Sequence, residues 1–153
     1  MSQHTATVVW QRGDQPFTDN AYSRGHHWRF DGGATVAASA SPEVVPLPMS
    51  VAENVDPEEA FVASLSSCHM LFFLAIAAKR RYIVDSYTDA AVGWTGKLDG
   101  KVAIIKIVLE PRISFIGEKV PTAEEMQTMH DKAHDLCFIA NSVKTEVITR
   151  ISV

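Results

Sequence analysis

The sequence contains two cysteines, Cys68 and Cys137, whose thiols are its strongest candidate nucleophiles. Each lies in a stretch that predicts a helix with a packed face, so the two thiols could meet once the chain folds. Their wide separation forms no CxxC motif and does not by itself show that they meet. The alternative is that each cysteine is a small buried hydrophobic residue, as most unpaired cysteines are.

A second group that could do chemistry lies on the same predicted helix as Cys137. His130, His134 and Cys137 stand at i, i+4 and i+7, on one face of a helix, and their side chains are of types that ligate zinc. The charged residues between them favour an ordinary amphipathic helix that carries histidines at its surface. We therefore expect no metal ligand in the chain.

The stretch that must position Cys68 comprises residues 56–79 and predicts a long buried helix. Asp56 is the expected N-cap, Pro57 suits the first helical position, and Glu59 completes a capping box. Apolar residues cover nearly every face, so other protein must surround the helix. Its length also matches a membrane span, but three serines, a histidine and several alanines dilute its apolarity. His69 is a poor partner for the neighbouring Cys68, because adjacent residues in a helix point about 100° apart, and we expect it to be packed or to lie at an interface.

The rest of the chain predicts strands and one more helix. Gly32 and Gly33 indicate a tight hairpin turn, and a capping box at Thr122 opens the second helix, which should end near residues 137–141. This order of elements indicates one α+β domain over residues 1–153 with mostly antiparallel pairing. Strands are expected at residues 6–10, 27–30, 35–38, 83–94, 102–109 (continuing past Pro111 to 115) and 146–153.

Composition excludes several classes of protein. The chain has 153 residues, a net charge of −4 and a pI near 5.8, with no basic stripe, so we expect no nucleic-acid partner. Its N-terminus lacks the pattern of a signal peptide, and its two cysteines make no disulfide framework. We expect a cytoplasmic protein without a membrane partner.

The residues around both cysteines resemble the OsmC/Ohr family, the osmotically inducible and organic hydroperoxide resistance proteins. Asp56-Pro57-Glu58, with Cys68 ten residues after Glu58, is similar to the family's central-helix signature. Residues 136–142 resemble its second-cysteine segment, and the order of elements is similar over nearly the whole chain. The resemblance implies an OsmC-like α+β fold, with antiparallel sheets around the central helix, in an intertwined homodimer.

The same resemblance implies a peroxiredoxin-like thiol peroxidase of oxidative or osmotic stress defence that needs no metal, flavin or haem. Cys68 would attack an organic hydroperoxide, Cys137 would form a disulfide with the oxidised Cys68, and an external dithiol would restore both thiols. Arg24 would stabilise the Cys68 thiolate, and Glu58 would orient Arg24 through a bidentate pair. The alternative is an OsmC-like protein that binds a small ligand or senses oxidants without turning them over.

Three features qualify the match. Phe138 stands where the hydroperoxide resistance branch has proline, so the chain resembles a less typical branch. Arg29 and Arg12 are weaker matches than Arg24 for the family's N-terminal arginine. Ten residues of helix span about 15 Å, so Glu58 cannot touch Cys68 of the same straight helix. A site that contains both therefore requires a bent helix or a second subunit, and we expect a homodimer.

Overall fold

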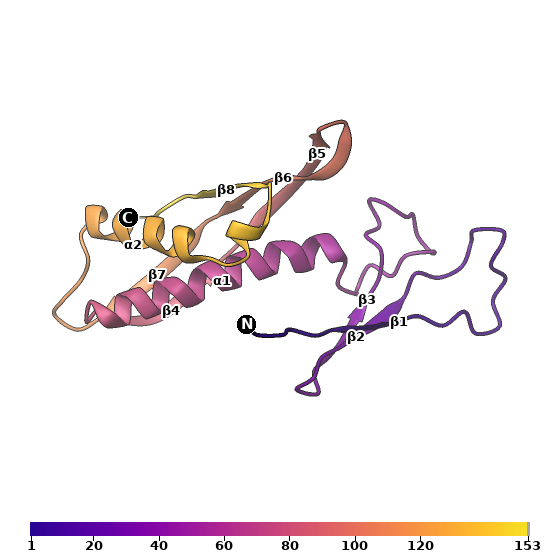
Figure 1. Cartoon of the computed structure of the whole chain (residues 1–153), viewed down its shortest axis with the longest axis horizontal. Helices are drawn as coiled ribbons and strands as arrows, with labels where there is room; N and C mark the ends of the chain where they lie inside the picture. The colour runs from indigo at the N-terminus through magenta and orange to yellow at the C-terminus, as the bar shows by residue number, and fades with distance from the viewer. Residues whose placement is uncertain (153) are drawn as a thin grey trace. The chain divides into compact units, whose positions relative to one another are not determined.

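The computed structural model describes residues 1–152, which form two compact units (Figure 1). The first unit is Met1–Ala60, and the second begins at Phe61. The expectation of one domain over residues 1–153 stays a prediction. Over the described residues the fold is α+β, as the sequence indicated, with two α-helices and mostly antiparallel sheets.

The first unit contains a three-stranded antiparallel sheet in the order β1-β2-β3. The hairpin predicted from the glycines is confirmed: β2 and β3 pair from His26 opposite Ala38 to Arg29 opposite Thr35. Gly33 closes the turn with a φ of 94°, a conformation that glycine adopts without strain. The strands are β1 (Thr7–Val9), β2 (His26–Arg29) and β3 (Thr35–Ala38).

The predicted central helix is α1 (Pro57–Lys79). Its capping box is confirmed, because the Glu59 amide donates to Asp56 Oδ1 at 2.8 Å and the Asp56 amide donates to Glu59 Oε2 at 3.0 Å. Only one stripe of α1 is buried within the chain, at Leu65, His69, Phe73 and Ala77. Leu71, on the opposite side, is 60% exposed. Much apolar surface of α1 is thus left without a partner among residues 1–152.

The second unit contains two sheets and helix α2 (Ala123–Leu136). One sheet pairs β4 with β7, and the other has the order β5-β6-β8, in which β8 runs parallel to β6. The Thr122 capping box is confirmed. The other elements are β4 (Ile83–Asp89), β5 (Val92–Leu98), β6 (Lys101–Leu109), β7 (Pro111–Ile116), the short 3-10 helix η1 (Ala140–Ser142) and β8 (Glu146–Thr149).

Two strands predicted as continuous are each broken where the chain passes from one sheet to the other. β4 ends at Asp89 and β6 ends at Leu109, so residues 83–94 and 102–115 form four strands rather than two. The Asp89 carboxylate accepts the Glu110 amide at 2.7 Å, in place of a ladder bond. Pro111, which has no N–H, begins the next strand. The predicted final strand is shorter than expected, and Val153 lies outside the described residues.

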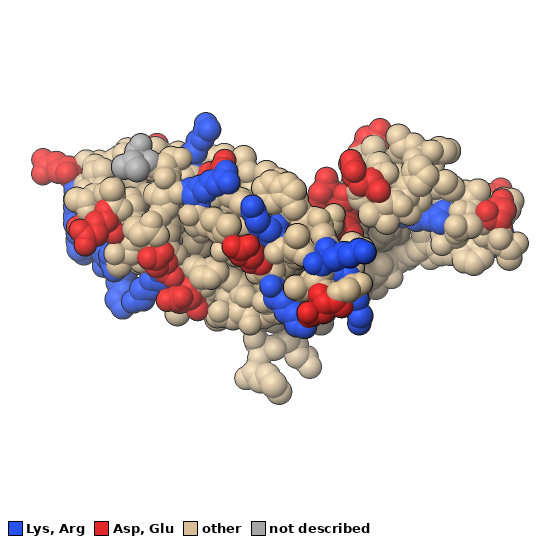
Figure 2. Space-filling view, turned by 90° about the horizontal axis from the view of Figure 1, so that it is seen from above, with Lys and Arg blue, Asp and Glu red and all other residues tan. Residues whose placement is uncertain are grey.

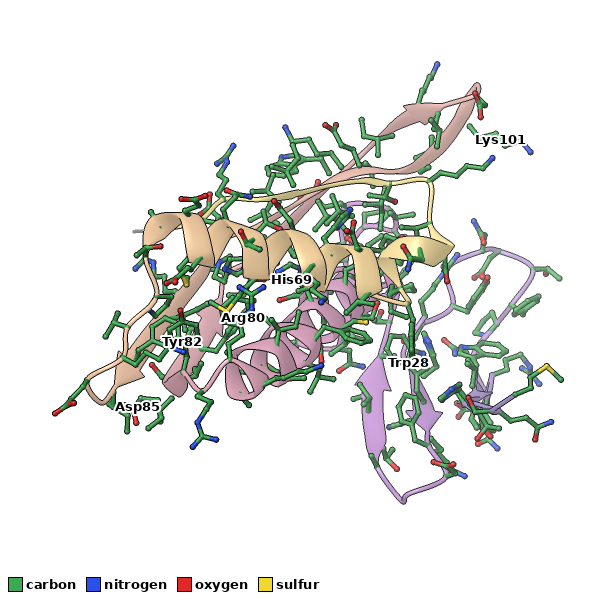
Figure 3. All side chains as sticks on the ribbon, turned by 60° about the vertical axis from the view of Figure 1, so that its left-hand side comes forward. Trp28, His69, Arg80, Tyr82, Asp85 and Lys101 are labelled. Carbon is green, nitrogen blue, oxygen red and sulfur yellow. The ribbon has the colours of Figure 1, made fainter. Side chains whose placement is uncertain are left out.

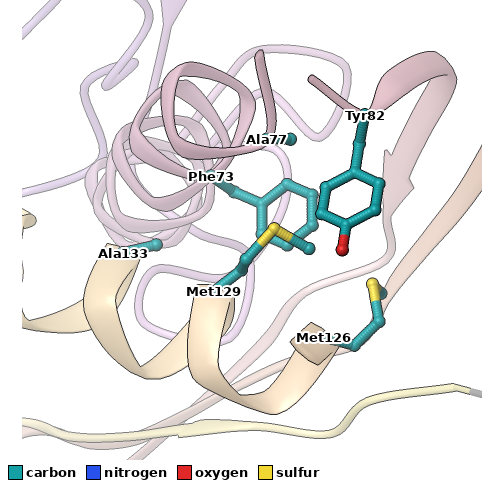
Figure 4. Packing of buried hydrophobic residues seen from close by; sticks show 6 residues of the cluster. All are labelled: Phe73, Ala77, Tyr82, Met126, Met129 and Ala133. Atoms are coloured by element: carbon teal, nitrogen blue, oxygen red, sulfur yellow. The ribbon is translucent and has the colours of Figure 1, made fainter. Parts of the chain in front are cut away.

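Two apolar clusters hold α1 within the second unit. The larger one, shown in Figure 4, joins α1 to α2 through Phe73, Met129 and Ala133, all fully buried. The smaller one places Leu65 against Ile107 and Leu109 of β6. Within residues 1–152, α1 is also the one helix whose length and composition would suit a membrane span. One stripe of α1 is buried in the two clusters, so the expectation that other protein surrounds the helix on nearly every face stays a prediction.

Candidate functional site

The structure brings the two cysteines together in the second unit. Cys68 lies on α1 and is half-buried, whereas Cys137 caps the C-terminal end of α2 and is 1% exposed. Neither cysteine forms a disulfide in the described part of the chain. The Cys68 side chain lies close enough to Cys137 to raise the pKa of its thiol. The sequence left open whether the two thiols meet, and the structure places them near each other at the α1–α2 junction.

The environment of Cys137 favours its protonated form. Burial is the main cause that raises the pKa of this thiol, and the neighbouring Cys68 raises it further. The Ala140 amide, which donates to Cys137 Sγ at 3.4 Å, opposes this shift. Cys137 is thus a thiol that is shielded from solvent and lies beside the more accessible thiol of Cys68.

Contacts on either side of the cysteines fix the register of α1 against α2. The rings of Phe72 and Phe138 meet edge to face with centroids 5.3 Å apart. On the other side, His69 Nε2 lies 2.9 Å from His130 Nδ1. Because Phe72 and His69 stand four residues and one residue after Cys68, these contacts hold the Cys68 side chain toward the end of α2.

The His69–His130 pair was not predicted from the sequence, although His69 was expected to be packed. Figure 3 labels His69 where α1 and α2 lie beside each other. Both histidines are 1% exposed. The N–H of one ring must donate a hydrogen bond to the unprotonated nitrogen of the other. Burial lowers the pKa of each histidine to about 4, so the pair is neutral near pH 7. A lone histidine within an apolar helix was the one sequence signal that could have pointed to this pair.

A polar group also lies beneath α1 near the cysteines. Ser66 Oγ donates a hydrogen bond to the Asp89 carboxylate. The same carboxylate accepts a hydrogen bond from the Glu110 amide, between β6 and β7. The Tyr87 hydroxyl, also on β4, is buried without a hydrogen-bond partner in residues 1–152. Burial raises the pKa of this hydroxyl, and the Asp89 charge raises it further.

Arg24 belongs to the first unit, in the loop before β2. Its guanidinium lies over the Tyr22 ring, with Cζ 3.7 Å from the centroid. It donates to the Asn20 and Tyr22 carbonyls and, at 2.9 Å, to Asn20 Oδ1. The same side chain lines a largely apolar pocket of about 460 Å³, together with Trp10, Phe17 and other residues of the first unit.

Glu58 does not pair with Arg24 within this chain. Within residues 1–152 the only ion pair joins Arg150 to Glu110. Glu58 Oε2 is inaccessible and has no hydrogen-bond partner among the described residues. The roles predicted for Arg24 and Glu58 therefore stay predictions.

The alternative metal site receives no support from the structure. Over residues 1–152 no group of three histidine, cysteine or acidic side chains is arranged to hold a metal ion. The His130 ring faces His69 and stacks on Phe73, with centroids 4.4 Å apart, instead of joining His134 and Cys137. Core packing between the helices thus decides its orientation.

The fold and the neighbouring thiols define an α+β protein with a two-cysteine site. The family described as OsmC-like protein matches residues 51–152, and the chain belongs to this family. This membership supports a peroxidase or redox role at the level of the family. No protein of curated function matches the chain.

Solved structures agree with this fold. An OsmC-like protein of unknown function from Vibrio cholerae O1 biovar eltor is 60% identical, with a TM-score of 0.98 over 99% of this chain and 100% of its own. An organic hydroperoxide resistance protein OsmC from Legionella pneumophila is 15% identical, with a TM-score of 0.72 over 100% and 98%. One from Elizabethkingia anophelis is 18% identical, with a TM-score of 0.70 over 99% and 94%. The last two show the fold alone.

Proposed function

We propose that this protein is a thiol peroxidase that reduces organic hydroperoxides to alcohols with Cys68 and Cys137. The observation that carries the proposal is the placement of a half-buried thiol beside a fully buried one at the α1–α2 junction. Membership of the OsmC-like family and structural similarity to hydroperoxide resistance proteins support it.

In the first step, the Cys68 thiolate attacks the terminal oxygen of ROOH. An S–O bond forms as the O–O bond breaks, so the sulfur is oxidised to sulfenic acid and, with one proton, the peroxide leaves as ROH. Cys68 is the better nucleophile for this step because it is the more accessible thiol. Exposed apolar side chains nearby, Leu71 at 60% and Phe138 at 72%, favour an organic peroxide over hydrogen peroxide.

In the second step, Cys137 condenses with the sulfenic acid. The Cys137 sulfur bonds to the Cys68 sulfur, and the hydroxyl leaves with the Cys137 proton as water. The raised pKa of Cys137 suits this order of events, because Cys137 keeps its proton until its partner is oxidised. An external dithiol then reduces the disulfide to two thiols and is itself oxidised to a disulfide.

We further propose that the working form is an intertwined homodimer in which Arg24 and Glu58 complete the site. Two observations support a partner: apolar surface of α1 stays exposed, and Glu58 Oε2 is enclosed without a counter-group among the described residues. In the dimer Arg24 would stabilise the thiolate and Glu58 would hold the guanidinium. The monomer–dimer state can be measured by light scattering at micromolar concentration, and a monomer would contradict this assembly.

Intact-mass analysis tests the cycle directly. The reduced protein would be treated with one equivalent of cumene hydroperoxide, with and without dithiothreitol. The expected result is a loss of two hydrogens per chain that dithiothreitol reverses and that Cys68→Ser abolishes. An unchanged mass would contradict peroxidase action, and full peroxide turnover by Cys68→Ser would exclude Cys68 as the nucleophile.

A further inference from the structure

A groove of about 420 Å³ runs between α1 and α2 in the second unit. It is lined by one face of α1, by Arg80 directly after that helix, and by two residues of α2 that are four positions apart. Its walls are the side chains of Phe72, Ala75, Ile76, Lys79, Arg80, Lys132 and Leu136. Apart from Phe72, whose ring contacts Phe138 beside the cysteines, none of these residues has a role in the proposed thiol cycle.

The apolar part of the groove lies toward the cysteines. Leu136 is 41% exposed, although it lies next to the fully buried Cys137. The Phe72 wall continues into Phe138, which contacts it edge to face and is 72% exposed. Water therefore meets an extended apolar strip here, and covering such a strip would release about 25 cal/mol per Å² of apolar surface.

The other part of the groove is cationic. Lys79, Arg80 and Lys132 line it, and no acidic side chain does. None of the three forms an ion pair within the described part of the chain. Over the face seen in Figure 2, charges of both signs are interspersed. The negative C-terminal end of the α1 dipole, about half a charge, offsets only part of this positive charge.

We propose that this groove binds a free long-chain carboxylate. The carboxylate would lie against Lys79, Arg80 and Lys132, and the alkyl chain would follow Phe72, Ile76 and Leu136 toward Phe138. Phe72 and Lys79 are separated by about 10 Å of helix, a distance that an extended fatty-acid chain can span. The combination of cations at one end and an apolar strip at the other matches an amphipathic anion better than a neutral or cationic ligand. This binding requires no thiol chemistry and goes beyond the peroxidase proposal.

The test uses full-length Cys68→Ser/Cys137→Ser protein, so that its result does not depend on peroxidase activity. Isothermal titration calorimetry would compare dodecanoate with dodecyltrimethylammonium, which has an alkyl chain of similar length and the opposite charge. We expect saturable binding of dodecanoate and at least tenfold weaker binding of the cation. Equal affinities, or no binding of dodecanoate, would overturn the proposal.

Two sets of charge variants then locate the site. Lys79→Gln/Lys132→Gln should weaken dodecanoate binding about tenfold, because two favourable charge contacts with the carboxylate are lost. Lys97→Gln/Lys101→Gln removes the same charge from the exposed β5–β6 hairpin, where Figure 3 labels Lys101, and should leave the affinity unchanged. Equal effects of the two pairs would overturn the proposed location.

Leu136→Asp tests the apolar strip, and it should abolish dodecanoate binding while circular dichroism stays unchanged. If the same variant instead converts a dimer to a monomer, the groove is a subunit interface and the proposal fails. It also fails if the protein co-sediments with phosphatidylglycerol vesicles but gives no heat with dodecanoate, because a membrane surface would then be the ligand.

Discussion

His69 Nε2 and His130 Nδ1 lie 2.9 Å apart in the apolar core, and this contact joins α1 to α2 beside the two cysteines. Each ring is 1% exposed, and burial lowers the pKa of each to about 4. The charge of His134 lowers the pKa of His69 further, whereas the charge of Asp89 raises it. In the same way, the charge of His69 lowers the pKa of His130 and the charge of Asp131 raises it. The two helices are thus held together by a pair that must stay neutral.

This pair predicts that stability falls in mild acid. An unfolded histidine titrates near pH 6.5, whereas these titrate near pH 4 when folded, so the unfolded chain binds more protons between these values. The stability is therefore present above about pH 6.5 and is lost as the pH falls toward 4. The free energy of unfolding, measured with urea, should drop by a few kcal/mol between about pH 7 and pH 4.5.

Matched variants assign this pH dependence. His69→Leu/His130→Phe removes both titrating rings and should flatten the curve, because an apolar pair needs no protonation change. His27→Gln removes an exposed histidine of β2 and should leave the slope unchanged. A wild-type slope in the double variant would show that other groups cause the acid sensitivity.

Cys137→Ser should convert the cycle into a single oxidation. The Cys68 sulfenic acid would form but would lack the thiol that condenses with it, so excess peroxide should carry it to the irreversible sulfinic acid. Mass spectrometry should find one added oxygen after one equivalent of cumene hydroperoxide and two after excess. Rapid multiple turnover by Cys137→Ser with dithiothreitol would mean that Cys137 is not needed to resolve the sulfenic acid.

Arg24→Ala should lower kcat/KM for cumene hydroperoxide at least tenfold. A guanidinium can hold a thiolate and the peroxide oxygens together, and losing one charged hydrogen bond costs about 1.5–3 kcal/mol. Arg12, which donates to the Gln15 carbonyl in the same unit, provides the control. Arg12→Ala should retain the wild-type rate; if both variants lose activity equally, Arg24 has no special role.

Gly93→Ala should destabilise the second unit by about 1–3 kcal/mol, as expected for overpacking. A Cβ on this β5 residue would lie 2.7 Å from Val62 Cγ2 on α1 and 3.3 Å from Ile107 Cγ1. Gly32→Ala is the matched control, because a Cβ there meets nothing within 4 Å. Thermal unfolding should therefore show a lower Tm for Gly93→Ala alone, and equal Tm values would contradict the tight α1–β5 contact.

Local signals in the sequence were sufficient for the helices and the first hairpin. The capping boxes of Asp56 and Thr122 involve residues three positions apart, and the turn at Gly33 depends on its own backbone. Such features need no distant partner, so they can be predicted from residue order. The family resemblance, likewise, rested on short motifs around Cys68 and Cys137.

Long-range contacts decided what the sequence could not. The strand break at Glu110 depends on the Asp89 carboxylate, 21 residues earlier in the chain, and the His69–His130 bond joins residues 61 apart. Residue order does not show which distant side chains meet, because helix register and sheet pairing are set by the packing of the whole core. For the same reason, only the tertiary structure showed that Cys68 and Cys137 are neighbours.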